Sequence, residues 1–94
     1  MTLDEAIDAV EPRPAAYVLR GAAADYLYKG SCRDLVKRLK DHRAGRVSRT
    51  RNRRPLRLVH FEYCPDYTNA RKQENWLKSG AGRKFLQQLT AAER

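Results

Sequence analysis

The sequence contains few cysteines and no long hydrophobic run, and each absence excludes a class of protein. Two cysteines, Cys32 and Cys64, are too few for the disulfide framework of a small secreted domain or for a structural zinc site. No apolar segment approaches the roughly 20 residues that cross a bilayer. The opening residues are acidic and lack the basic and apolar regions of a signal peptide. These absences predict a soluble protein of a reducing compartment, which we place in the cytoplasm.

The most widespread catalytic signatures are missing as well. The chain has no phosphate-binding loop of the G-x-x-x-x-G-K-S/T type, no H-E-x-x-H, no C-x-x-C and no G-x-S-x-G. Its two histidines argue against a Ser-His-Asp site. With 94 residues it can bury one modest hydrophobic core, so we expect a single domain over residues 1–94.

Acidic residues are scarce outside the first part of the chain. Twenty Lys and Arg face eleven Asp and Glu, a net charge of +9, and four of the acids lie in the first eleven residues. We therefore separate an acidic N-terminal segment, residues 1–13, from a strongly basic remainder. A domain this basic attracts polyanions, and nucleic acid is favoured over an anionic membrane because no helix combines a wide apolar face with a basic one. Charge alone leaves open a ribosome-associated or merely soluble basic protein.

Hydrophobic periodicity and turn residues predict a mixed α/β chain. We expect a short docked helix at 3–10, strands at 16–20 and 26–29 joined by residues 21–25, and a third strand at 58–63. Gly30 is expected to end the second strand. Ser31 and Asp34 form a capping-box pattern, which predicts a helix from there to about residue 44 with Gly45 at its end.

Two further helices are expected after the third strand. Asp66 or Thr68 caps the first, which runs to residue 78 and stops at Gly80. Gly82 leads the last helix, whose expected core contacts are Phe85, Leu86 and Leu89. Apart from the N-terminal helix, the predicted order is β-β-α-β-α-α.

Residues 43–57 hold seven arginines and no acid: Arg43, Arg46, Arg49, Arg51, Arg53, Arg54 and Arg57. We predict a loop that contacts the DNA backbone, because arginine contacts to phosphate bind nucleic acid without reading its sequence. A solvated loop with no ligand is the alternative.

A few residues have side chains suited to phosphodiester chemistry. Arg38 and His42 share one helical stripe, and an arginine can hold a phosphate with two hydrogen bonds. Glu74 is the only acid between Asp66 and Glu93, and Mg²⁺ needs only one or two protein carboxylates when water and phosphate complete its shell. Tyr17, like Tyr28, is in general more often a core aromatic than a catalyst. A phenol acts as a base near neutral pH only where positive charge lowers its pKa.

Several motifs occur in order along the chain: Tyr17, Tyr28-Lys29-Gly30, D-L-V-K-R-L-K-D-H over residues 34–42, Arg53-Arg54-Pro55, and E-N-W-L-K-S-G-A-G-R-K-F-L over residues 74–86. Together they resemble the GIY-YIG nuclease family, in particular its small single-domain bacterial members, over residues 15–89. The chain departs from the family in its first tripeptide, Ala15-Ala16-Tyr17. It also has Ser31 where excision-repair relatives carry a basic residue.

The resemblance implies an α/β fold with a small three-stranded antiparallel sheet flanked by helices. It also implies a metal-dependent endonuclease that hydrolyses DNA phosphodiester bonds, with a role in DNA repair or recombination. Tyr17 would be the general base, Arg38 would stabilise the phosphate, Tyr28 and His42 would position or protonate groups, and Glu74 would hold Mg²⁺ or Mn²⁺.

The expected partner is double-stranded or branched DNA, with an accessory protein supplying specificity. The residues expected to contact substrate are Lys29, Gly30, Arg46, Arg49, Arg51, Arg53 and Arg54. The alternative is a catalytically silent basic module that binds nucleic acid, and a purely structural basic protein is a third reading.

Overall fold

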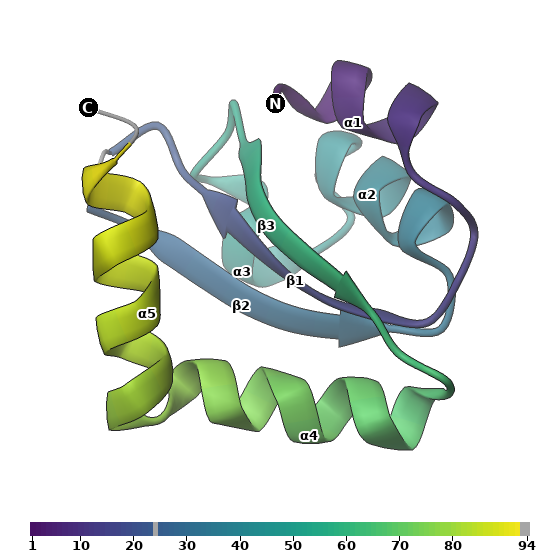
Figure 1. Cartoon of the computed structure of the whole chain (residues 1–94). Coiled ribbons are helices and arrows are strands. Elements are labelled where there is room, and N and C mark those ends of the chain that lie inside the picture. The colour runs from purple at the N-terminus through teal and green to yellow at the C-terminus, as the bar shows by residue number, and fades with distance from the viewer. Residues whose placement is uncertain (24, 93–94) are drawn as a thin grey trace.

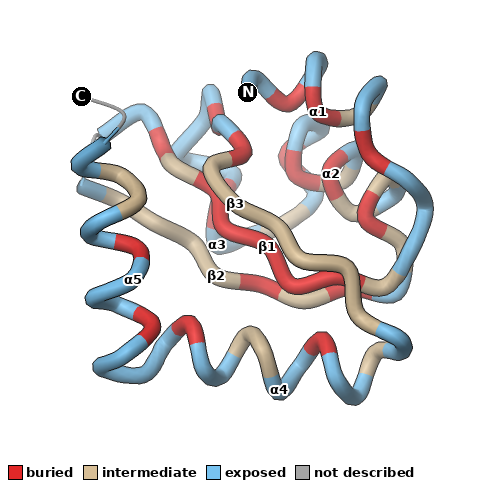
Figure 2. Tube along the Cα trace, viewed as in Figure 1, coloured by how far each residue is buried: buried red, intermediate tan, exposed pale blue. Residues whose placement is uncertain are grey.

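Three antiparallel strands form the centre of the fold (Figure 1). The computed structural model describes residues 1–23 and 25–92, so Ala24 of the expected hairpin connection lies outside the described residues. The strands are β1 (Ala15–Arg20), β2 (Leu27–Cys32) and β3 (Arg57–Tyr63), in the spatial order β2-β1-β3. β1 pairs with both neighbours, and Figure 2 shows it buried over most of its length. The antiparallel sheet implied by the resemblance is confirmed.

Helices cover both faces of this sheet. α1 (Leu3–Ala9) and α2 (Leu35–Arg43) lie on one side, and α4 (Tyr67–Lys78) and α5 (Gly80–Ala91) lie on the other (Figure 1). β1 serves both layers because successive side chains of a strand point to opposite faces. Tyr17 and Leu19 therefore pack with α1 and α2, whereas Ala16 and Val18 pack with α4 and α5.

The N-terminal helix is tied to both the sheet and α2. Thr2 forms a capping box with Glu5, which supplies acceptors for the free N–H groups at the start of α1. The Met1 amino group donates to the Leu58 carbonyl, and the Leu58 N–H donates back to Met1. Leu3 and Val10 are buried in the same core as Tyr17, so the acidic segment contributes apolar side chains to the domain core.

Two sequence predictions around Gly30 are wrong. β2 continues through Cys32, so Gly30 lies within the strand, and Ser31 is a strand residue instead of a helix cap. Asp34 caps α2 by accepting a hydrogen bond from the Lys37 N–H. The S-x-x-D pattern is a local rule, and strand pairing that extends to Ala15 opposite Cys32 overrides it here. Gly45, with φ of 78°, does follow the end of α2 as predicted.

The arginine-rich segment and the C-terminal helices also differ from expectation. Residues 43–57 are not a continuous loop, because α3 (Ser48–Arg51) interrupts them. α5 begins at Gly80 and is capped by Ser79, while Gly82 sits in its first turn. Phe85 remains 36% exposed, so it is not the core residue that periodicity predicted, whereas Leu86 is buried. Asp66 caps α4 as expected, and no helix in the described part of the chain could cross a membrane.

Candidate active site

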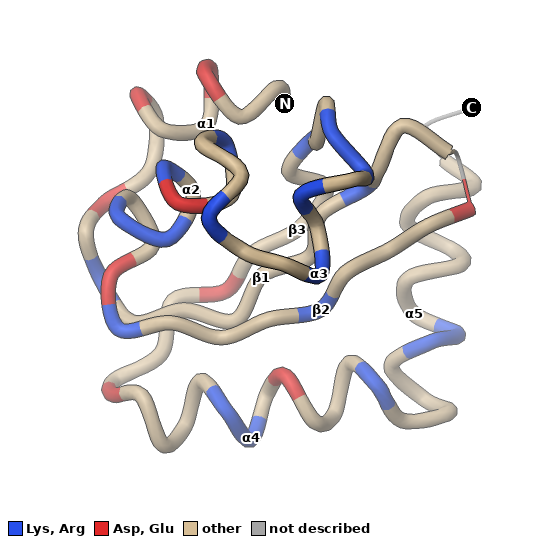
Figure 3. Tube along the Cα trace, turned by 180° about the vertical axis from the view of Figure 1, so that it is seen from behind, with Lys and Arg blue, Asp and Glu red and all other residues tan. Residues whose placement is uncertain are grey.

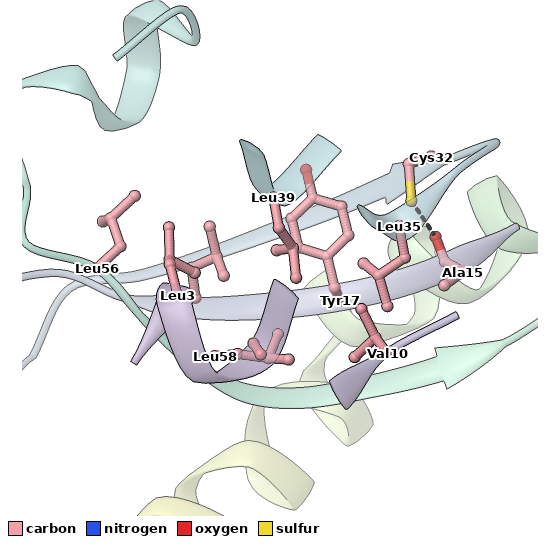
Figure 4. Packing of buried hydrophobic residues seen from close by; sticks show 11 residues of the cluster. Leu3, Val10, Ala15, Tyr17, Cys32, Leu35, Leu39, Leu56 and Leu58 are labelled. Atoms are coloured by element: carbon pink, nitrogen blue, oxygen red, sulfur yellow. Dashed lines mark hydrogen bonds between the residues drawn. The ribbon is translucent and has the colours of Figure 1, made fainter. Parts of the chain in front are cut away.

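The buried part of the candidate site joins β1, α2 and α3. Tyr17, His42 and Thr50 have no exposed surface. The Tyr17 hydroxyl lies 2.7 Å from Nε2 of His42, and Nδ1 of His42 lies 2.8 Å from the Thr50 hydroxyl. Both distances are those of good hydrogen bonds, so the three side chains form one chain of polar contacts inside the domain. Figure 4 shows the Tyr17 ring near Leu35 and Leu39 of α2.

Tyr28 lies at the edge of this buried group. Its ring centroid is 5.2 Å from that of His42 and 6.2 Å from that of Tyr17. Gly30 sits directly opposite Tyr17 in the strand register. A Cβ atom at Gly30 would lie 2.6 Å from the Tyr17 hydroxyl oxygen, so only glycine leaves room for the phenol here.

Arg38 supplies the positive charge of the site. Its guanidinium interacts with the hydroxyls of Tyr17 and Tyr28, while its buried Nε atom has no hydrogen-bond partner among the described residues. Burial raises the pKa of Tyr17, and the nearby Arg38 charge opposes that rise only in part. Burial, helped by Arg38, lowers the pKa of His42 to about 4. At neutral pH the tyrosine and the histidine are therefore both uncharged.

Glu74 lies in a more open part of the site, on α4. Its Oε1 accepts a hydrogen bond from the Ser31 hydroxyl at 2.6 Å, and its Oε2 accepts one from the Lys78 ammonium at 2.6 Å. Partial burial raises the pKa of Glu74, but the hydrogen bonds from Lys78 and Ser31 outweigh it and leave the pKa below its usual value. The carboxylate is therefore ionised and held in place from two sides.

A hollow of about 370 Å³ lies beside Glu74. It is lined by Tyr28, Lys29, Arg49, Glu74 and Lys78. Tyr28 thus contacts the buried group with its ring and also borders the hollow in which Glu74 lies. The space suits a phosphate group, because three cationic side chains surround it with one carboxylate.

Glu74 can serve a hard divalent ion, but with few protein ligands. The described residues contain no cluster of three or more His, Cys, Asp or Glu side chains. Mg²⁺ and Mn²⁺ tolerate this, because waters and substrate phosphate oxygens fill most of the shell of Mg²⁺ in many sites. An ionised carboxylate beside a hollow lined by cationic side chains fits such an ion.

The arginines of residues 43–57 do not all face this hollow. Figure 3 shows basic residues along α3 and the segments around it. Arg49 borders the hollow, Arg46 pairs with Asp41 at 3.0 Å, and the Arg53 guanidinium lies 4.3 Å from the centre of the Tyr26 ring. A second pocket of about 880 Å³ at the end of the sheet is lined by five arginines: Arg20, Arg43, Arg51, Arg54 and Arg57.

The sequence interpretation did not identify two residues of this site. Ser31 directly follows Gly30, so its position in the motif was visible, but the capping pattern assigned it to a helix end. Thr50 lies eight residues after His42, and no spacing rule links the two. Only the docking of α3 against α2 brings its hydroxyl to the imidazole.

Comparisons with known proteins show the family of this chain. The chain matches the GIY-YIG catalytic domain family over residues 14–85, which is most of its length. It is 39% identical over 54 residues to a UPF0213 protein of Haloquadratum walsbyi, covering 56% of this chain and 61% of that relative. The match thus spans less than two thirds of the relative's length, and no solved structure matches the chain. The chain belongs to the GIY-YIG family of nuclease domains.

Proposed function

We propose that this protein is a metal-dependent endonuclease that hydrolyses DNA phosphodiester bonds, with Tyr17 as the general base. The observation that carries the proposal is the meeting of five candidate residues around one strand pair. Tyr17, Arg38 and His42 form the buried part, Glu74 borders the open hollow, and Tyr28 touches both. GIY-YIG domains are nuclease domains, which supports a nucleic-acid substrate.

The proton path starts from a neutral Tyr17. Its phenolic proton passes to Nε2 of His42, which is uncharged and 2.7 Å away. The resulting phenolate takes a proton from the attacking water, whose oxygen bonds to phosphorus as the P–O bond to the leaving strand breaks. The leaving oxygen takes up a proton, and Tyr28 is the hydroxyl placed nearest the hollow to deliver or position it.

Arg38 stabilises the charge that develops in this reaction. Its guanidinium already contacts both phenols, so it favours the phenolate over the neutral phenol. Arg38 also lines an open pocket of about 510 Å³ with Ser31 and Lys37, from which it would donate to a phosphate oxygen.

Glu74 would hold Mg²⁺ or Mn²⁺, which supplies Lewis-acid stabilisation of the phosphate when bound. Ser31 and Lys78 keep the carboxylate ionised and oriented towards that task. Ser31 thus supports Glu74 at the position where excision-repair relatives have a basic residue.

The DNA backbone would run over the basic surface beside the hollow. Lys29 and Arg49 line the hollow itself, and Gly30 leaves the strand open beneath Tyr17. Arg46, Arg51, Arg53 and Arg54 would contact phosphates further along double-stranded or branched DNA. A protein of DNA repair or recombination in the cytoplasm fits this chemistry, with specificity supplied by an accessory protein.

A catalytically silent DNA-binding module is the competing function. Two observations favour it: Tyr17 has no exposed surface, and both oxygens of Glu74 already accept hydrogen bonds. The deciding experiment incubates supercoiled, linear and branched DNA with the protein in Mg²⁺, in Mn²⁺ and in EDTA. Metal-dependent nicking supports the nuclease, whereas a gel shift without any cleavage identifies the silent module.

A further inference from the structure

We propose that Thr50 is a positioning residue that fixes the tautomer of His42, so that Nε2 stays free to accept the Tyr17 proton. This inference rests on the proposed nuclease function, because the tautomer matters only if Tyr17 gives up its proton. It assigns a role to a side chain outside the family motifs described above.

The hydrogen-bond inventory at Tyr17 requires an acceptor at Nε2. The Arg38 charge acts on the Tyr17 hydroxyl, and the phenolic proton needs an acceptor because the residue is fully buried. Nε2 of His42, at 2.7 Å, is the partner that the structure gives for that proton. If Nε2 carried a hydrogen, it would face the hydroxyl as a second donor and the phenolic proton would have no acceptor.

The surroundings of Thr50 are compatible with the same tautomer on the other side of the ring. The Thr50 hydroxyl lies 2.8 Å from Nδ1 of His42 and 3.5 Å from the Val47 carbonyl oxygen, which is a long and weak acceptor. With Nε2 accepting from Tyr17, Nδ1 carries the ring hydrogen and donates it to the Thr50 oxygen. The Thr50 hydrogen then turns towards the Val47 carbonyl oxygen.

Thr50 is held in one place beside the imidazole. It is fully buried in α3, and its N–H donates to the Val47 carbonyl at 3.1 Å. Without its hydroxyl, Nδ1 would lose its acceptor, and the imidazole would exchange between tautomers or rotate. A proton on Nε2 would then block the first step of the proposed proton path.

The test uses a matched pair of substitutions at one site. Thr50→Val keeps the shape of the side chain and removes the hydroxyl, whereas Thr50→Ser keeps the hydroxyl and removes a methyl group. The chain has only two histidines, so ¹⁵N-histidine NMR spectra resolve His42 once a His60→Gln variant identifies the other signals. The spectra report which ring nitrogen carries the proton, and they need no DNA and no metal.

We expect His42 to carry its proton on Nδ1 in the wild type and in Thr50→Ser, and to lose this single tautomer in Thr50→Val. The rate of single-turnover cleavage with Mg²⁺ should fall by about 10²-fold or more in Thr50→Val, which is the lower end of the rate loss when an acid–base group is misplaced. The rate should recover in Thr50→Ser. A wild-type proton on Nε2 overturns the inference, as does an unchanged His42 spectrum in Thr50→Val.

Two further outcomes separate this inference from the proposed function. If Thr50→Val does not fold, a proton on Nδ1 in both wild type and Thr50→Ser still supports the assignment, and any other tautomer overturns it. If the tautomer follows Thr50 while even the wild type cuts no DNA, Thr50 sets the tautomer as inferred and the nuclease proposal fails.

Discussion

The buried and the open parts of the site use opposite electrostatics. In the buried part, removal from water raises the pKa of Tyr17 and lowers that of His42, so both stay neutral. In the open part, hydrogen bonds from Lys78 and Ser31 overcome partial burial and keep Glu74 charged. The difference shows how one small domain can keep a neutral phenol and imidazole on one side of Tyr28 and an ionised carboxylate on the other.

The largest expected effect is at Glu74, in the open part. Glu74→Ala should reduce cleavage below detection, because the proposed ion loses its only protein carboxylate. The fold should persist, since Glu74 belongs to neither hydrophobic core, and only its hydrogen bonds to Ser31 and Lys78 are lost. Cleavage and thermal melting measure the two effects, with Glu62→Ala as a control acid that borders no part of the hollow. If Glu74→Ala cleaves DNA at the wild-type rate, Glu74 does not hold the ion.

The next largest effect is at Tyr17, in the buried part. Tyr17→Phe keeps the ring and deletes the hydroxyl, so turnover should fall by about 10²–10⁴ while DNA binding is retained. Tyr28→Phe should lose less activity if its hydroxyl only positions or protonates groups. Single-turnover nicking by both variants, with melting curves as a check on folding, makes the comparison. If Tyr28→Phe is inactive while Tyr17→Phe cleaves at a nearly normal rate, Tyr28 is the general base and Tyr17 only positions or protonates groups.

Between about pH 6.5 and pH 4, acid should weaken the fold through the buried part. The pKa of His42 is about 4 in the folded protein, whereas a histidine in the unfolded chain takes up its proton near pH 6.5. The unfolded state therefore binds more protons, and stability falls as the pH drops from about 6.5 to 4, by on the order of 3 kcal/mol. Urea unfolding at several pH values should show this loss, and a His42→Gln variant should show a flatter dependence.

A substitution at Gly30 tests how tightly the rings of Tyr17 and Tyr28 pack against β2. A methyl group at Gly30 would press on the Tyr17 hydroxyl and the Tyr28 ring, so Gly30→Ala should cost about 1–3 kcal/mol of unfolding free energy and lower cleavage as well. Gly80→Ala is the matched control, because a Cβ there meets nothing within 4 Å. Equal stability of the two variants would show that β2 shifts freely around Tyr17.

The smallest effect concerns the arginines. Arg49→Ala, at the edge of the hollow, should lower the slope of log K against log salt by about 0.9 and weaken all DNA sequences alike. Lys84→Ala removes an equal charge from α5, away from the hollow, and should leave the slope nearly unchanged. A fluorescence binding titration at several salt concentrations measures both. Equal slopes for Arg49→Ala and wild type would show that Arg49 is solvated and contacts no phosphate.

The sequence predicts the sheet, the main helices and the residues that motifs place in order. Arg38 and His42 come together because i and i+4 lie on one helix face, and that spacing is visible in the chain. The sequence assigns Ser31 to a helix end because Ser31 and Asp34 fit the capping pattern. In the structure the pairing of β2 with β1 extends through Ser31, which makes it a strand residue. Thr50 could not be predicted, because its contact depends on how α3 docks. Periodicity placed Phe85 in the core, but it remains 36% exposed and packs its ring against His60 and Trp76.

Ser79 joins α4 to α5 and so affects the position of Glu74, which lies on α4. This one residue ends α4 and caps α5: its hydroxyl donates to the Trp76 carbonyl and accepts from the Gly82 N–H. At Gly82 an added Cβ would overlap the backbone of α4, so the two helices meet without space to slide. The two helices therefore meet at a fixed angle, and α5 adds to the contacts with the sheet that hold α4, and with it Glu74, in place. Insertions between residues 79 and 82 would change that angle even though they lie outside the hollow.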